Sequence, residues 1–234
     1  MNELYSLENA QKFKWSSVTG NLNPERVSHL KTYLVGQKIL DVGCGGGAYV
    51  EFLAQQGLEV TGVDKYNQFL QIAHEKSRMG IYVQGDITKL PFPDKTFDCT
   101  YCFDVLEHVD DQLAIEELAR VTTKRLILAV PQEDEIMTQF NLTFLHYQDK
   151  THLRNYTDEN FRNLILKINC SNILIFPELA VPTKYLVQNI VECRNSDSFV
   201  KAFFHKTSYF LLKKLLSTVA YKQVNTGLVA VIDL

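Results

Sequence analysis

A glycine-rich segment is the first part of this chain whose residue types and spacing could bind a ligand. A predicted strand over residues 39–42, apolar except for Asp41, leads into Gly43, Gly45 and Gly47, and a helical pattern follows over residues 49–56. Glycines let the backbone approach a ligand closely, and free amides at the start of a helix favour an anionic group. A pyrophosphate and the carboxylate of a methionine moiety both meet that requirement, so the turn alone leaves both open.

Asp64 adds a second binding element, because it closes the strand-like run of residues 60–64. A carboxylate at that place can accept both hydroxyl protons of an adenosine ribose. Capping of the next helix is the structural alternative for Asp64, and an ordinary strand-to-helix turn is the alternative for the glycines. Since strand, turn, helix and carboxylate occur together in this order, we expect a ribose-bearing ligand.

Three histidines are candidates for a general base, the side chain that would activate a hydroxyl acceptor near neutral pH. Residues 144–156 form a polar segment that contains His146, Asp149 and His152. We expect His152 to be the base, with His146 and His108 as further catalytic candidates. Folding of the loop through hydrogen bonds to the backbone explains Asp149 and His152 equally well.

No metal site is expected. His146 and His152 lack the spacing of ligands on a helix or a short hairpin, and no third ligand is evident. Cys99 and Cys102 lie in a predicted strand, where residues i and i+3 face opposite sides, and no second cysteine pair exists. We therefore expect both thiols to be buried in the sheet.

The elements that position these residues follow from alternating strand-like and helical patterns. The strand-length apolar runs are residues 38–42, 60–63, 81–84, 97–103 and 125–130, followed by 173–176 and 227–234. Strands that alternate with helices indicate a parallel sheet. We predict an α/β, Rossmann-like, doubly wound, mainly parallel seven-stranded sheet with helices on both faces and a helical insertion before the last strand.

Two helices have legible starts. Asp110 is a predicted N-cap for a helix that buries Ala114, Leu118 and Val121. Thr157 is a predicted N-cap for a helix that runs through residue 168. Both helices are expected to cover the sheet.

The chain is expected to form a single domain over residues 1–234. Its parts are an N-terminal helical cap (1–36), a core with the ligand site (37–179), a helical insertion or lid (180–226) and the last strand (227–234). Residues 199–221 show a helical pattern with an apolar face and a basic face. The apolar face contains Phe204, Leu211 and Leu215, and the basic face contains Lys206, Lys213 and Lys214. Such a face can cover the cleft, form a homodimer or lie on a membrane, in that order of preference. Phe13, Trp15 and Tyr33 are expected either to close the cleft or to pack in the core.

Composition limits the partners and the compartment. The net charge is −3, so nothing global draws the chain to nucleic acid or anionic lipid. Five cysteines in 234 residues are a sparse and odd number, which argues against a disulfide framework. No signal-peptide pattern and no membrane-length apolar run is legible, so we expect a cytoplasmic protein.

Residues 38–131 resemble the class I S-adenosylmethionine-dependent methyltransferases, especially the type 11-like group that acts on small molecules. The glycine turn, residues 80–87 and residues 90–109 carry the resemblance in order and spacing. A dinucleotide dehydrogenase would share the glycines and Asp64, but it has no reason to share residues 90–109.

The resemblance implies S-adenosylmethionine as the cofactor. Asp86 would reach the adenine amino group and Ile87 would flank the ring, while Asp41 lies beside the glycine turn. Phe103 and Asp104 would lie near the methionine end, and Cys44 would be a small packing residue. The full set of implied cofactor-binding residues is Asp41, Gly43, Cys44, Gly45, Gly47, Asp64, Lys65, Asp86, Ile87, Phe103, Asp104 and His108.

The implied reaction is methyl transfer to a small metabolite or glycan-type acceptor, with S-adenosylhomocysteine as product. Alignment of acceptor, methyl group and sulfur matters more for this reaction than elaborate acid–base chemistry. Residues 149–152 resemble an element of bacterial relatives that modify sugars and other metabolites, although Lys150 replaces the usual proline. Two alternatives remain, an RNA methyltransferase and a module that binds S-adenosylmethionine without catalysis.

Overall fold

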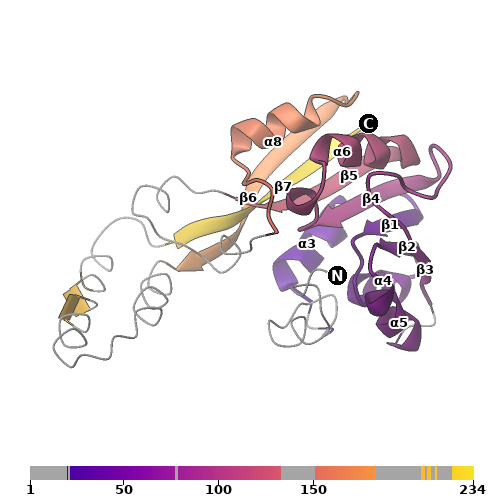
Figure 1. The fold of residues 1–234 in the computed structure, drawn as a ribbon, viewed down its shortest axis with the longest axis horizontal. Helices are drawn as coiled ribbons and strands as arrows, with labels where there is room; N and C mark the ends of the chain where they lie inside the picture. The colour runs from indigo at the N-terminus through magenta and orange to yellow at the C-terminus, as the bar shows by residue number, and fades with distance from the viewer. Residues whose placement is uncertain are drawn as a thin grey trace.

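One mixed sheet is the framework of the computed structural model, which describes residues 20, 22–76, 79–132, 151–182, 207–208, 210–211, 214 and 223–234. Within these residues, seven strands are ordered β3-β2-β1-β4-β5-β7-β6 (Figure 1). The strands are β1 (Lys38–Val42), β2 (Glu59–Asp64), β3 (Ile81–Gln84), β4 (Phe97–Phe103), β5 (Thr122–Pro131), β6 (Asn172–Pro182) and β7 (Gln223–Asp233). The predicted α/β class and strand number are confirmed.

The first five strands run parallel, and β7 is antiparallel to both of its neighbours. In the register, Val42 of β1 lies opposite Val63 of β2 and Cys102 of β4. The strand order reverses between β1 and β4, so the carboxyl ends of these strands border a crevice. The segments that follow β1, β2, β3 and β4 therefore meet at one edge of the sheet.

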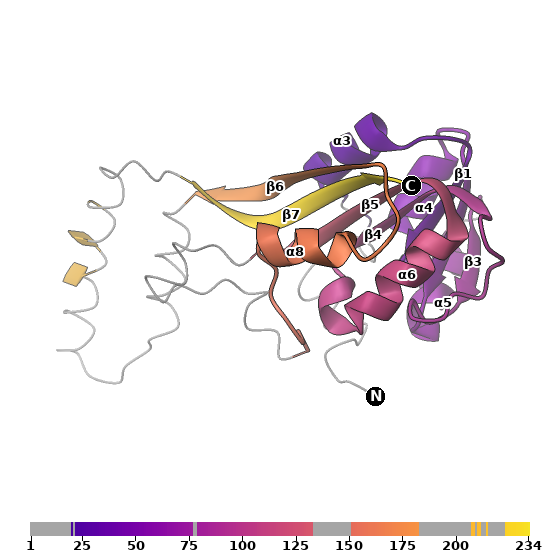
Figure 2. The ribbon, with the colours of Figure 1, turned by 90° about the horizontal axis from the view of Figure 1, so that it is seen from above.

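Helices cover both faces of the sheet. They are α3 (Pro24–Tyr33), α4 (Ala48–Ala54), α5 (Asn67–Lys76), α6 (Asp111–Val121), α8 (Asp158–Ile165) and the short 3-10 helix η2 (Leu106–His108). Figure 2 shows α3 on one side of β5, β6 and β7, with α6 and α8 on the other. One buried cluster contains Leu118 and Phe161, and the other contains Leu30 and Leu53.

The two cysteines of β4 confirm the alternation expected of a strand. Cys102 belongs to the cluster beneath α6 and α8, whereas Cys99 belongs to the cluster on the opposite face. Both are completely buried, and both are free thiols. Their CxxC spacing therefore brings no pair of sulfurs together.

The predicted helix starts are confirmed by their caps. Asp110 accepts hydrogen bonds from the backbone N–H groups of Gln112 and Leu113 at 3.2 and 3.1 Å. Thr157 forms a reciprocal capping box with Asn160. The helix that starts there ends at Ile165 rather than at residue 168, because the chain tightens into i to i−3 hydrogen bonds after Ile165.

The last two strands are longer than predicted. Residues 180–182 and 223–226 were expected in a helical insertion, but they extend β6 and β7. They can do so because the two strands pair with each other along their whole length, to Pro182 opposite Gln223. Among residues 183–222, those described at 207–208, 210–211 and 214 are helical.

Some predictions fall on residues that the structure does not describe. These residues are Phe13, Trp15, His146, Asp149, Cys193, Phe204, Lys206, Lys213 and Leu215. The extent of the N-terminal cap and the presence of a lid between residues 183 and 222 therefore stay predictions. Within the part of the chain that is described, no helix has the length and apolar character needed to cross a membrane.

Candidate active site

A cavity of about 780 Å³ opens at the carboxyl ends of the parallel strands. Of the residues predicted to bind the cofactor, all except Gly47 line it, and so does His152. The topology thus gathers into one cavity residues that lie far apart in the sequence.

The glycine turn is shaped by backbone conformations that other residues rarely adopt. Gly43, Gly45 and Gly47 have φ angles of +81°, +52° and +77°. A Cβ on Gly43 would lie 2.3 Å from Cγ2 of Val105, and one on Gly47 would lie 2.5 Å from the Tyr82 hydroxyl. Gly47 is the N-cap of α4, so it shapes the turn without lining the cavity.

Asp64 holds the backbone around the glycine turn, and it does not cap α5, which begins at Asn67. Its Oδ2 accepts from the Gly45 N–H at 2.9 Å, and its Oδ1 accepts from the Tyr66 N–H at 2.8 Å. The side chain also lines the cavity, and burial raises its pKa. Since each oxygen of a carboxylate can accept more than one hydrogen bond, Asp64 can hold the turn and still receive ribose hydroxyls.

Asp86 and Ile87 form a polar and an apolar surface side by side. Lys65 Nζ lies 3.0 Å from Asp86 Oδ2, and the Thr88 backbone N–H donates to Asp86 Oδ1 at 3.0 Å. Burial acts in the opposite direction, but the hydrogen bonds from Thr88 and Lys65 lower the pKa of Asp86. An ionised acceptor beside the buried Ile87 suits the amino group and the face of an adenine ring.

Arg26 is a cavity residue that sequence reasoning missed. Helix α3 brings it to the end of β4, where its Nη2 donates to Asp104 Oδ1 at 2.9 Å. Its guanidinium carbon also lies 5.1 Å from the centre of the Phe103 ring. Asn23 and Pro24 are legible signals for the start of α3, but no local pattern shows which residue of that helix reaches the cavity.

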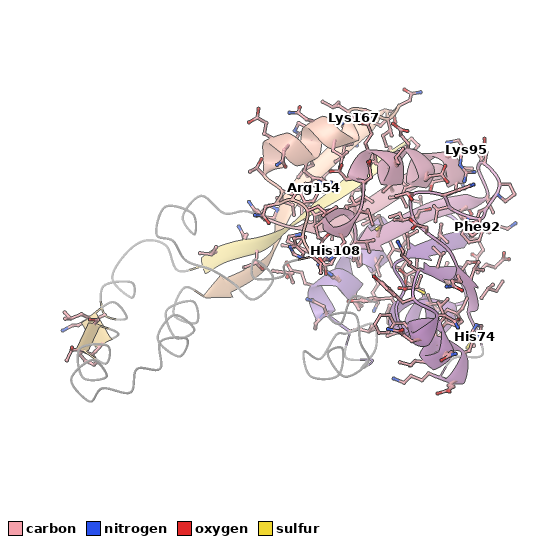
Figure 3. All side chains as sticks on the ribbon, viewed as in Figure 1. His74, Phe92, Lys95, His108, Arg154 and Lys167 are labelled. Carbon is pink, nitrogen blue, oxygen red and sulfur yellow. The ribbon has the colours of Figure 1, made fainter. Side chains whose placement is uncertain are left out.

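Two of the three candidate bases lie together at the other side of the cavity. The ring centres of His108 and His152 are 4.7 Å apart, and His108 Nδ1 lies 3.0 Å from the Thr151 hydroxyl. The Arg154 side chain donates to the carbonyl of Leu106 at 2.9 Å, and Figure 3 accordingly draws Arg154 close to His108. His146, the third candidate, lies outside the described residues.

Glu107 is a second residue that was missed. Its side chain is only 1 % exposed, and its Oε1 lies 3.8 Å from His108 Nε2. One ligand atom from each of Glu107, His108 and His152 falls within 4.8 Å of the others. The prediction of no metal considered only the pair of His146 and His152, and it did not foresee this set.

The rest of the cavity wall beyond the histidines is mostly apolar. It comes from β5, β6 and β7, from the residue after η2 and from the segment before α8, and the residues are Val109, Val130, Pro131, Leu153, Leu179, Thr226 and Gly227. Tyr33 does not belong to this lining. Its ring lies 5.7 Å from that of Phe176, so core packing is the role the structure gives it.

Residues 40–130 match a family model described as a methyltransferase domain. This part of the chain, which runs from β1 to β5, is therefore similar to the methyltransferase domains that the model describes. The chain is similar to the ubiquinone biosynthesis O-methyltransferase of Haemophilus ducreyi, with 36% identity over 115 residues, which are 44% of this chain and 49% of that protein. It spans about half the length of the curated relatives it matches.

Solved structures share the fold of this chain. One is an S-adenosylmethionine-dependent methyltransferase from Archaeoglobus fulgidus, with a TM-score of 0.68 and 17% identity over 98% of this chain and 100% of that one. Another is phosphoethanolamine N-methyltransferase 2 from Haemonchus contortus, with a TM-score of 0.65 and 16% identity over 99% of this chain and 58% of that one. At this level of identity the likeness concerns the fold alone.

Proposed function

We propose that this chain is an enzyme that transfers the methyl group of S-adenosylmethionine to a small-molecule acceptor and releases S-adenosylhomocysteine. The observation that carries the proposal is the order of side chains along one cavity. Asp86 and Ile87 follow β3, Asp64 ends β2, the glycine turn follows β1, and Asp104, which binds Arg26, follows β4; these strands are neighbours in the order β3-β2-β1-β4. This order matches the adenine, the ribose and the amino-acid part of that cofactor.

The glycine turn supports a fit between cavity and cofactor. A side chain at Gly43 would collide with Val105, so the backbone there leaves room that only glycine allows. Asp64 faces this space with acceptor capacity for ribose hydroxyls. We propose that Arg26 binds the carboxylate of the methionine moiety, because a guanidinium is the natural partner of a carboxylate. Asp104 would then take the ammonium group.

The chain's part in the reaction is to bind, to orient and to move one proton. When bound, S-adenosylmethionine supplies a methyl group activated by a positively charged sulfur. Residues around the glycine turn and Arg26 would fix the position of that sulfur, and the apolar wall near Leu153 and Leu179 would hold the acceptor. We propose that His152 accepts the proton of an acceptor hydroxyl, with His108 beside it as a second base.

Transfer to oxygen is the proposed reaction because two histidines face the cavity and because the curated relatives are named as O-methyltransferases. The acceptor is proposed to have an apolar part, which matches the wall beyond the histidines. The cavity supports the proposed cofactor and acceptor. The proposed cytoplasmic setting is supported by the free thiols of Cys44, Cys99, Cys102 and Cys170. A lid, a homodimer and contact with a membrane surface stay predictions, since they depend mainly on residues outside the described part of the chain.

The test is methyl transfer from isotopically labelled S-adenosylmethionine to a panel of small hydroxyl compounds and, separately, to RNA. Labelled small-molecule product supports the proposal. We expect His152→Gln to lower kcat by about 100-fold or more while S-adenosylhomocysteine affinity stays unchanged. His74→Gln is the control, because His74 lies on α5 and is not a cavity residue.

Each other outcome corresponds to an alternative. Labelled RNA without any small-molecule product would contradict the proposed acceptor class. Cofactor binding without product from either panel would favour a binding module. Unchanged turnover in His152→Gln would remove His152 from the mechanism.

A further inference from the structure

Glu178 is a buried carboxylate that the proposed reaction does not use directly. It lies on β6, its side chain has no exposed surface, and its Oε1 accepts from Arg26 Nη2 at 2.8 Å and from Arg26 Nε at 3.3 Å. His29 Nε2 lies 3.4 Å from its Oε2. Burial lowers the pKa of His29, so near neutral pH the charged partner of Glu178 is Arg26.

The backbone around Glu178 is arranged to accommodate this side chain. Glu178 lies opposite Gly227, and a Cβ on that glycine would lie 2.9 Å from Glu178 Cγ. The next residue, Leu179, has a φ of +57°, a left-handed conformation that is unfavourable for a residue other than glycine. The Leu179 N–H donates to Glu25 Oε2 at 3.1 Å, which joins β6 to α3 a second time.

Stability alone is a poor explanation for this buried pair. Removing two charges from water costs free energy that their attraction often fails to recover. The cost is visible at Glu178, because burial raises its pKa to about 7 and Arg26 only partly opposes this. At Arg26, burial acts to lower the pKa, but the carboxylates of Asp104 and Glu178 together raise it. The guanidinium is therefore charged and held at the cavity.

The two carboxylates that bind Arg26 differ in one decisive respect. The side chain of Asp104 is 47% exposed at the cavity, whereas that of Glu178 is sealed beneath the guanidinium. An incoming carboxylate can therefore replace Asp104 on Arg26, and Asp104 can turn toward solvent or toward an ammonium group. Glu178 keeps its place and fixes Arg26 through Nε and Nη2 while this exchange takes place.

We propose that Glu178 is a positioning residue of the cofactor site, which holds Arg26 in the orientation that binds the carboxylate of the methionine moiety. The inference rests on the proposed function and adds a residue that contacts no ligand itself. It makes a specific claim, because the loss of Glu178 should affect only ligands that carry the amino-acid part.

The test compares two ligands on the same variants. S-adenosylhomocysteine carries the amino-acid part, and 5′-methylthioadenosine contains the same nucleoside without it. Both are titrated calorimetrically at about pH 8, where Glu178 is ionised. We expect Glu178→Gln to weaken S-adenosylhomocysteine about tenfold and to leave 5′-methylthioadenosine within about twofold.

Further variants separate positioning from folding. Arg26→Ala should weaken S-adenosylhomocysteine, and adding Glu178→Gln to it should cause no further loss, because both changes remove the same interaction. Glu178→Asp keeps the charge but draws it back, so an intermediate loss is expected for S-adenosylhomocysteine only. Asp233→Asn is the matched control, since Asp233 of β7 pairs with Arg125 of β5 at 2.7 Å but does not line the cavity.

The outcomes distinguish this inference from the proposed function. If Glu178→Gln and Glu178→Asp weaken both ligands equally, or neither ligand, Glu178 is only structural and the inference is overturned while the cofactor assignment stands. If the wild-type chain binds neither ligand, the proposed function fails and the inference fails with it. Additive losses in the double variant also contradict the positioning role.

Discussion

Replacing Asp64 by Asn tests how the chain recognises a ribose. In the structure, the two carboxylate oxygens accept one backbone hydrogen bond each, from Gly45 and from Tyr66. Asn keeps one oxygen and replaces the other with an NH₂ group, which cannot accept. The variant therefore loses the negative charge, one of the two sites that could receive a ribose hydroxyl, and one of the two backbone hydrogen bonds.

The size of the effect follows from the hydrogen bond that is lost. A hydrogen bond to a charged group contributes about 1.5–3 kcal/mol, so S-adenosylhomocysteine should bind about 10- to 100-fold more weakly to Asp64→Asn. Burial raises the pKa of Asp64 because it disfavours the charged form of the side chain. A neutral Asn does not carry that desolvation cost, so we expect the variant to fold.

The assay is calorimetric titration with S-adenosylhomocysteine and with its 2′,3′-dideoxy analogue. The loss should be larger for the ligand that carries the hydroxyls, because the weakened turn affects both ligands alike. Asp98→Asn is a suitable control, because Asp98 accepts from the Gln37 and Lys38 N–H groups at 2.8 and 3.0 Å at the start of β4, away from the cavity. An equal loss for the dideoxy analogue would refute the assignment of Asp64 to the ribose and leave it only the turn.

Three further predictions concern the fold that carries the site. Burial raises the pKa of Asp41 to about 7, so between about pH 4 and about pH 7 the folded chain holds a proton that the unfolded chain has released, and stability should fall as the pH rises through this window. The free energy of unfolding, measured by urea denaturation between about pH 5 and about pH 8, should fall less with pH in Asp41→Asn than in the wild-type chain. An unchanged dependence on pH would show that Asp41 is not the group that causes the fall. Gly43→Ala should abolish cofactor binding, because the new Cβ would lie 2.3 Å from Val105 Cγ2. Gly57→Ala is the control: Gly57 has a φ of +86° and nothing lies within 4 Å of an added Cβ, so the variant should lose about 1 kcal/mol of stability and bind the cofactor as before. Asp110→Ala should cost about 1 kcal/mol by removing the N-cap of α6, measured by urea denaturation, with no effect on ligand affinity; a loss of affinity would show that α6 and the site are coupled.

The parts of the fold that the sequence predicted depend on short-range signals. Apolar runs, glycines and capping residues such as Asp110 and Thr157 act within a few residues of themselves, so their outcome is legible along the chain. The gathering of the predicted cofactor residues around one cavity was also predictable, because the carboxyl ends of parallel strands must meet at one edge. Asp64 and Asp86 needed only that topology and the family motifs.

The residues that were missed depend on contacts between distant parts of the chain. Arg26 and Glu178 are 152 positions apart, and neither has a local pattern that indicates the other. Glu107 stands next to a predicted residue, but its burial follows from the packing of η2 against β5 and the segment before α8. The full lengths of β6 and β7 were likewise hidden, since each strand is extended by pairing with the other.

The central claim is that the cavity at the strand ends binds S-adenosylmethionine and its product. Calorimetric titration of the wild-type chain with S-adenosylhomocysteine and, in parallel, with NAD tests it most directly. We expect saturable binding of S-adenosylhomocysteine, with one molecule per chain, and no binding of NAD. Binding of NAD without binding of S-adenosylhomocysteine would contradict the assignment of the site.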